Sequence, residues 1–106
     1  MNQQKKLDEV LYAKLTLETA KMAWKELERF FASGALIAVQ PELDLVEVAV
    51  CIANDDKTAI AQWLSDGHIA KVTDAQALRW HEADANLWTV VVKPWILVQE
   101  EKSSTH

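Results

Sequence analysis

Residues 44–72 place two helix patterns and a strand pattern in close succession, and this order limits the fold more than any other feature. The run DLVEVAVCIANDDKTAIAQWLSDGHIAKV contains an apolar helical stretch over 45–53 and a polar turn at 54–56. A second helical pattern over 57–66 and a strand pattern over 68–72 follow. Helix, tight turn, helix and strand in this order are typical of a helix-turn-helix or winged-helix domain.

Capping residues mark where the predicted helices begin. Asp44 and Glu47 have the spacing of a capping box at the start of the first helix, with Asp in place of the usual Ser or Thr. Thr73 and Gln76 repeat this spacing and predict a short helix over 74–83. Both signals come before apolar residues, as expected for helices that pack on a core.

Large apolar side chains on the predicted helices indicate the core. In the helix over 57–66, Ile60, Trp63 and Leu64 share one face and are predicted to be buried. Trp24 keeps the same helical spacing further upstream and is a second core tryptophan. Aromatic residues at helical spacing belong to a core more often than to a ligand pocket.

The two ends of the chain complete the element order. Residues 5–33 have a helical pattern, as one helix or two, and the apolar run over 35–39 predicts a strand. The run WTVVVKPWILVQ at 88–99 is the strongest strand signal in the chain. Pro94 cannot donate a ladder hydrogen bond, which predicts an edge strand or a bulge at that point.

These elements predict an α+β fold that is winged-helix-like, with helices packed on a small antiparallel sheet. A different α+β sandwich built from the same elements is the alternative. A chain of 106 residues suits one domain, here residues 1–99, followed by a polar disordered tail over 100–106.

The charge of the chain argues against a DNA reader. Residues 44–67 carry five Asp or Glu side chains against Lys57 alone, whereas DNA readers need Lys and Arg to neutralise phosphates. The net charge of −5 also disfavours anionic membranes. The single Cys51 and the lack of an apolar run near ~20 residues favour a cytoplasmic address. We therefore expect no nucleic-acid partner and no membrane partner.

Five runs of residues carry a family resemblance that covers about residues 12–100. They are ETAKMAW at 18–24, ELERFFASG at 26–34, LDLVEVAV at 43–50, NDD at 54–56 and the close LWTVVVKPWILVQE. Together they resemble a family of small bacterial proteins known as domain of unknown function 2288. The resemblance implies a bacterial, cytoplasmic, single-domain protein and brings no activity, cofactor or catalytic residue. It also leads us to expect Ser or Pro where this chain has Ala23, which leaves open whether residues 5–33 form one helix or two.

Residues with binding or catalytic chemistry are few and scattered. A ligand pocket could be lined by Arg79, Trp80, His81 and Trp88, although these tryptophans could instead pack on the core. Potential metal ligands lack the spacing of a metal site; they are Cys51, His68, His81, Glu82 and Asp84. No GxSxG, GxGxxG or P-loop motif occurs. We therefore predict no catalytic residue, no metal site and no cofactor.

The closing strand is apolar on both faces, so its second face needs a cover. Either a helix of the same chain covers it or a second copy does, most simply in a two-fold dimer. The candidate interface consists of Trp88, Val90, Val92, Trp95 and Leu97.

The sequence favours a non-enzymatic protein-interaction or structural module that forms a homodimer and contacts an unidentified protein partner. The alternative is a small-molecule-binding protein or minor enzyme with a Trp-lined site, and the third interpretation is a DNA-binding regulator.

Overall fold

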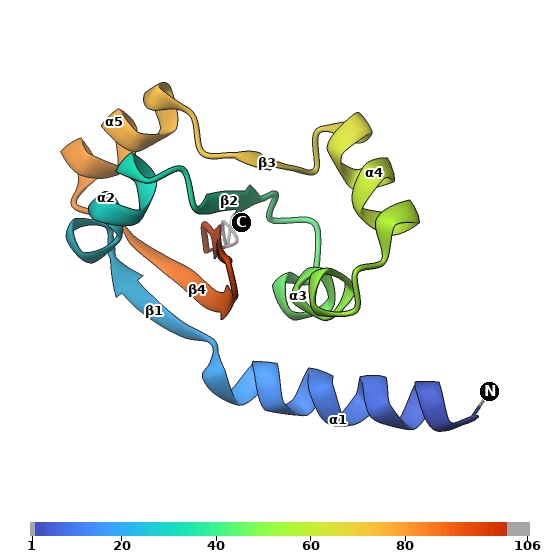
Figure 1. Ribbon diagram of the computed structural model, residues 1–106. Helices are drawn as coiled ribbons and strands as arrows, with labels where there is room; N and C mark the ends of the chain where they lie inside the picture. The colour runs from blue at the N-terminus through green and yellow to red at the C-terminus, as the bar shows by residue number, and fades with distance from the viewer. Residues whose placement is uncertain (1, 102–106) are drawn as a thin grey trace, which may run out of the picture.

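The computed structural model describes residues 2–101, with side chains from Lys6 onward, and shows an α+β fold (Figure 1). Helices and strands follow in this order: α1 (Asn2–Glu18), β1 (Ala20–Ala23), α2 (Trp24–Ala32), β2 (Leu36–Val39), α3 (Leu45–Ala53), α4 (Lys57–Asp66), β3 (Ile69–Lys71), α5 (Asp74–Ala83), β4 (Asn86–Val92) and β5 (Trp95–Gln99). Most of the predicted tail, from residue 102 to 106, lies outside the described residues.

The strands form one mixed sheet in the order β1–β4–β5–β2–β3. All neighbours are antiparallel except β2 and β5, which run parallel with Ile37 opposite Leu97. The prediction of an antiparallel sheet is therefore wrong for this pair. Parallel neighbours need a long crossover connection, and α3, α4, β3, α5 and β4 all lie between β2 and β5 in the sequence.

The segment over 88–99, predicted as one strand, is a hairpin at the centre of the sheet. Val92 of β4 lies opposite Trp95 of β5, so Lys93 and Pro94 form the turn between them. The Lys93–Pro94 peptide bond is cis. The predictions of an edge strand or a bulge are wrong, because Pro94 sits in a turn, where no ladder hydrogen bond is required of it.

The first helical region is two helices separated by β1. Trp24 begins α2, and its backbone N–H donates to the Ala85 carbonyl over 2.8 Å. The four residues of β1 are Ala, Lys, Met and Ala, all good helix formers or neutral in helices. They are extended because they pair with β4, so cross-strand pairing outweighs local propensity. Ala23, with extended backbone, is the residue before α2.

Helices cover both faces of the sheet (Figure 1). On the first face, α1, α3 and α4 pack over side chains that include Val90 and Leu97. On the second face, α2 and α5 pack over Leu87, Ile96 and Val98. Helices of the same chain therefore cover both faces of the closing strands. This is one of the two alternatives that the sequence left open.

The predicted caps are present. The Asp44 carboxylate accepts hydrogen bonds from the backbone N–H groups of Val46 and Glu47, at 3.0 and 3.4 Å. Thr73 and Gln76 form a reciprocal capping box at the start of α5. The bounds of α3, α4 and α5 agree with the predicted ranges because each helix has a cap that the sequence displays.

The helix α4 is less buried than predicted. Ile60 and Trp63 are half-buried, whereas Leu64 is 53% exposed. The prediction of a core position is therefore wrong for Leu64, while Trp24 is buried as predicted. The reason is that α4 contacts α3 and β3 at the end of the sheet and leaves open space beside the strands.

Candidate functional site

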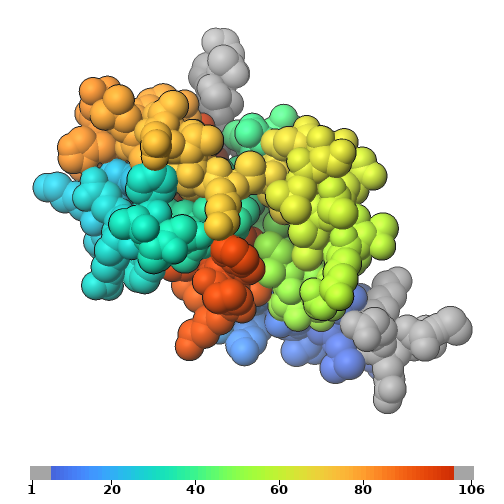
Figure 2. Space-filling model, turned by 45° about the horizontal axis from the view of Figure 1, so that its top comes forward, coloured from blue at the N-terminus to red at the C-terminus, as the bar shows by residue number. Residues whose placement is uncertain are grey.

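An open groove of about 500 Å³ lies between α4 and the strands on the first face of the sheet. Its apolar lining comes from both helices of the α3–α4 pair, from β2, from β3 and from the β4–β5 hairpin: Ile37, Ile52, Ile60, Leu64, Ile69, Pro94 and Trp95. Its charged lining consists of Asp55, Lys71 and Lys93. In Figure 2 the red-orange hairpin turn and the yellow-green α4 both reach this face of the molecule. We refer to this hollow as the α4 groove.

Strand pairing directs Lys71 into the α4 groove. Ile37 of β2 is paired with Lys71 of β3, and directly paired residues project from the same face of a sheet. Ile69 lies two residues before Lys71 and therefore shares that face. The Lys71 ammonium lies 5.5 Å from the centroid of the Trp95 ring, within the range of a cation–π contact.

The opposite wall of the groove is the inner face of α4. Asp56 caps this helix by accepting a hydrogen bond from the Ala59 N–H, and Gly67 ends it with φ of +80°. Ile60 and Leu64 are four residues apart, so they lie on the same side of the helix. They face the half-buried Trp95 across the groove, and no other described side chain fills the space between.

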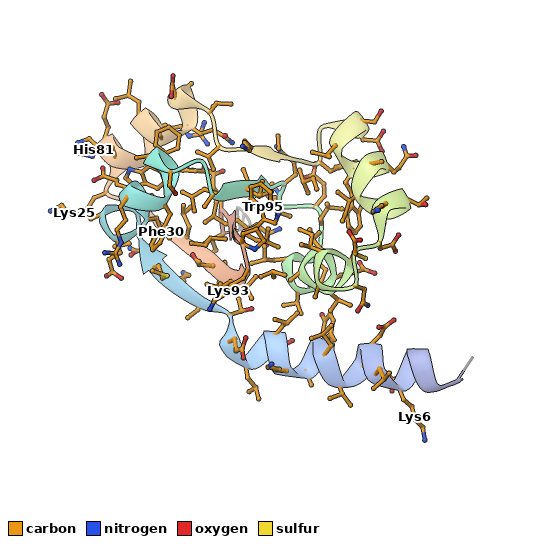
Figure 3. The ribbon with its side chains drawn as sticks, viewed as in Figure 1. Lys6, Lys25, Phe30, His81, Lys93 and Trp95 are labelled. Atoms are coloured by element: carbon orange, nitrogen blue, oxygen red, sulfur yellow. The ribbon has the colours of Figure 1, made fainter. Side chains whose placement is uncertain are left out.

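The α4 groove is locally basic in an acidic chain. Asp55 of the groove lining lies 3.9 Å from Lys57, which is not part of the lining. Among the residues that the structure describes, Lys71 and Lys93 form no ion pair with a carboxylate. Lys93 and Trp95 flank Pro94 on the hairpin (Figure 3). An apolar surface edged by two unpaired ammonium groups suits a molecule with an apolar body and a negative charge.

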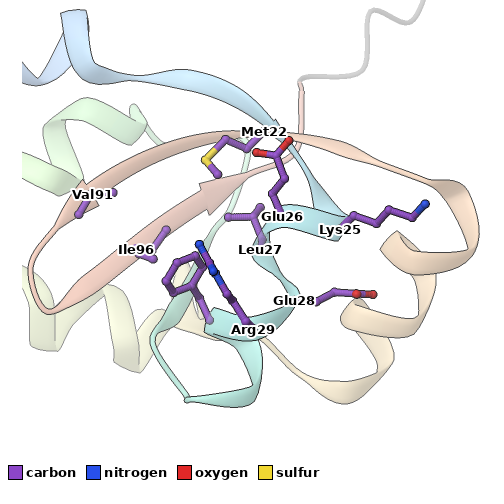
Figure 4. Close-up of a pocket in the computed structure, with 9 residues that line it drawn as sticks. Met22, Lys25, Glu26, Leu27, Glu28, Arg29, Val91 and Ile96 are labelled. Atoms are coloured by element: carbon purple, nitrogen blue, oxygen red, sulfur yellow. The ribbon is translucent and has the colours of Figure 1, made fainter.

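A second hollow, of about 640 Å³, lies between α2 and the hairpin on the other face (Figure 4). Its apolar part includes Val91 and Ile96, whereas Lys25 and Glu28 point away from it. The guanidinium of Arg29 already lies over the Phe30 ring, 4.9 Å from its centroid. Charges of both signs line this hollow, so neither sign dominates. The hollow also offers less apolar surface than the α4 groove.

The residues of the predicted Trp-lined pocket do not come together. Trp80 is buried on the second face, and its Nε1–H donates to Glu100 Oε2 over 2.6 Å. Arg79 donates to the same oxygen over 2.6 Å, and His81 Nδ1 lies 2.9 Å from Glu28 Oε2. Trp88 packs on the first face, where Lys21 lies over its ring. The sheet therefore separates Trp88 from the other three.

Most of the predicted interface lies inside the monomer. Val90, Val92 and Leu97 are buried beneath α1 and α3, while Trp88 and Trp95 are half-buried. Trp95 is the one of the five that lines the α4 groove.

Sequence reasoning missed Lys71 and Lys93 as site residues. Lys71 occupies a strand position that alternates onto the apolar face with Ile69, and this alternation was the available signal. Lys93 precedes Pro94 and gives no signal of its own, because its placement depends on the hairpin turn.

Groups with nucleophilic or metal-binding chemistry lie apart from the groove. Burial raises the pKa of the Cys51 thiol, and the carboxylates of Asp56 and Glu47 add to this effect. Within residues 6–101, no three His, Cys, Asp or Glu side chains are placed to hold a metal ion. No helix in the described part of the chain is long and apolar enough to cross a membrane.

Comparisons with known proteins identify relatives over nearly the whole chain. The solution NMR structure of PA1075 from Pseudomonas aeruginosa is 48% identical in sequence and has a TM-score of 0.80. The alignment covers 92% of this chain and 90% of that one. No curated protein matches the chain. Residues 10–100 match the family model described as "Protein of unknown function (DUF2288)", and the chain therefore belongs to that family.

Proposed function

We propose that the protein is a non-enzymatic binding module whose α4 groove holds the apolar part of a ligand. One observation carries this proposal: seven apolar side chains line an open groove of about 500 Å³. Ligand sites are usually hollows of ~300–1,000 Å³ with mostly apolar walls. Leu64 is exposed and Trp95 is half-exposed, so a ligand in the groove would remove apolar surface of both from water.

Titration with decanol, a neutral apolar probe, tests the proposal. Binding should change the fluorescence of Trp95, and this change should be absent in Trp95→Phe. Leu64→Gln should weaken binding about fivefold, because the lost contact is part of the ~1.5–3 kcal/mol of a fully buried leucine. Gln and Leu have similar helix propensities, so α4 itself should persist.

Leu78→Gln is the matched control, because Leu78 is 57% exposed on α5 and lies outside the groove. Its decanol affinity should equal that of the wild type. Equal weakening in both variants, or no weakening in Leu64→Gln, contradicts the proposal.

The α3–α4–β3 order supports a winged-helix likeness limited to these elements, and we assign it the role of building the groove. The acidic turn at Asp55 and Asp56 is a poor surface for nucleic-acid phosphates. A cytoplasmic location is part of the same proposal, supported by a single cysteine, Cys51, that cannot form an internal disulfide.

Exposed apolar side chains on α1 favour self-association as a second function. Leu7, Val10 and Leu17 are 62%, 67% and 87% exposed, and their spacing places them along one side of the helix. Pairing of α1 with its copy about a two-fold axis would bury all three. We place the proposed interface here because the core of the closing strands is already covered.

Sedimentation equilibrium tests the dimer. The wild type should be dimeric at micromolar concentration, and the double variant Val10→Gln, Leu17→Gln should be monomeric. A wild type that stays monomeric at a hundredfold higher concentration contradicts self-association.

A further inference from the structure

Two lysines from distant parts of the chain converge on the α4 groove. Lys71 ends β3, whereas Lys93 lies in the hairpin turn, and both side chains line the groove. The Trp95 ring is 5.5 Å from the Lys71 ammonium, and Lys93 lines the same groove two residues before Trp95 in the chain. The positive charges are therefore placed at the apolar surface itself.

The charge balance of the groove opposes that of the whole chain. The chain carries a net charge of −5, yet the charged lining of the groove is two lysines and one aspartate. Asp55 has Lys57 nearby, at 3.9 Å. The apolar chain of a ligand would displace water from the groove, and an ammonium group attracts a bound anion more strongly where water is excluded. The groove thus complements a negative charge carried on an apolar body.

We propose that the α4 groove binds an amphipathic anion, with an apolar chain along Ile60, Leu64 and Ile69 and the anionic headgroup at Lys71 and Lys93. This inference rests on the proposed function and adds the chemical class of the ligand. The headgroup chemistry is that of a carboxylate or a phosphate ester, since either accepts charge-assisted hydrogen bonds from lysine.

Probes that share one apolar chain and differ in headgroup test the class. The probes are decanoate, decyl phosphate, decanol and decyltrimethylammonium, each kept below its micelle concentration and followed by Trp95 fluorescence. At low salt, at least one anion should bind about five- to tenfold more tightly than decanol, and the ammonium probe more weakly than decanol. The difference in affinity between the anion and decanol should become smaller as the salt concentration is raised, because salt screens the attraction. The tighter of the two anions identifies the headgroup.

The double variant Lys71→Gln, Lys93→Gln should lose the preference for the anion and keep the affinity for decanol. Lys25→Gln, on the opposite face, is the control and should keep both. Circular dichroism confirms folding, and the single variant Lys93→Gln, in the exposed turn, serves if the double variant fails to fold.

Each outcome separates this inference from the proposed function. Equal binding of anions and decanol overturns the anionic class and leaves the apolar groove as a binding site. A preference for anions that survives removal of the two lysines also overturns the inference, because other groups must then bind the anionic headgroup. Failure of all four probes overturns both.

Discussion

Replacing Leu97 with Ala distinguishes a core strand from an interface strand. Leu97 has no exposed surface and lies in β5, which is flanked by β4 and β2. The hydrogen-bonded neighbours on both sides hold the backbone in place, so the structure can relax little into the gap. The change removes three carbons at ~0.8 kcal/mol each and leaves a cavity that costs on the order of 1 kcal/mol. We expect the free energy of unfolding to fall by about 3–4 kcal/mol.

Urea unfolding measures this loss. With an m-value of about 1.5–2 kcal/mol/M, the unfolding midpoint should fall by about 2 M. Domains of this size are stable by ~5–15 kcal/mol, so the variant should still fold. Leu78→Ala is the matched control, because its exposed side chain should contribute under ~1 kcal/mol.

Two results would refute the reasoning. A loss under ~1 kcal/mol for Leu97→Ala would show that this side chain is not in a packed core. A loss of stability in Leu97→Ala that depends on protein concentration would place Leu97 in an interface between copies.

Three further predictions concern the rest of the molecule. Trp63→Ala should lower the free energy of unfolding by roughly 1.5–3 kcal/mol in urea melts, less than for a fully buried tryptophan, because Trp63 is half-buried; a loss above ~4 kcal/mol would contradict this. Hydrogen bonds from Trp80 and then Arg79 hold the pKa of Glu100 below 4.5. The stability from this ionised carboxylate is present above pH 4.5 and lost as pH falls below it, so Glu100→Gln should lose less stability than the wild type between about pH 5 and pH 3. An equal loss in both proteins would rule out this source of acid sensitivity. Mobility-shift titration at low salt should show no binding to generic duplex DNA tighter than ~10⁻⁴ M, and micromolar, salt-sensitive binding would contradict the structural role of α3 and α4.

Local signals were sufficient for the helices that have caps. The Asp44 cap, the polar turn at 54–56 and the Thr73–Gln76 box placed α3, α4 and α5 with their observed bounds. Each signal acts within a few residues, so no knowledge of the rest of the chain is required.

Non-local pairing explains what the sequence could not show in the N-terminal half and the hairpin. The strand β1 consists of residues that suit a helix, and only its partner β4 makes it extended. The five residues of the candidate interface nevertheless share one face of the sheet, although one strand was predicted. Val92 and Trp95 are cross-strand partners, so a two-residue turn keeps both on the first face with Val90 and Leu97.

The α4 groove depends on the one parallel pair of the sheet. Parallel pairing of β2 with β5 sets Ile37 opposite Leu97, and antiparallel pairing of β2 with β3 sets Ile37 opposite Lys71. Trp95, at the start of β5, therefore lies at the same end of the sheet as Lys71. If β5 ran antiparallel to β2, as the sequence suggested, Trp95 would lie near Val39, away from Lys71. The direction of a central strand has no local signature in the sequence, so the groove could not be predicted from the sequence alone.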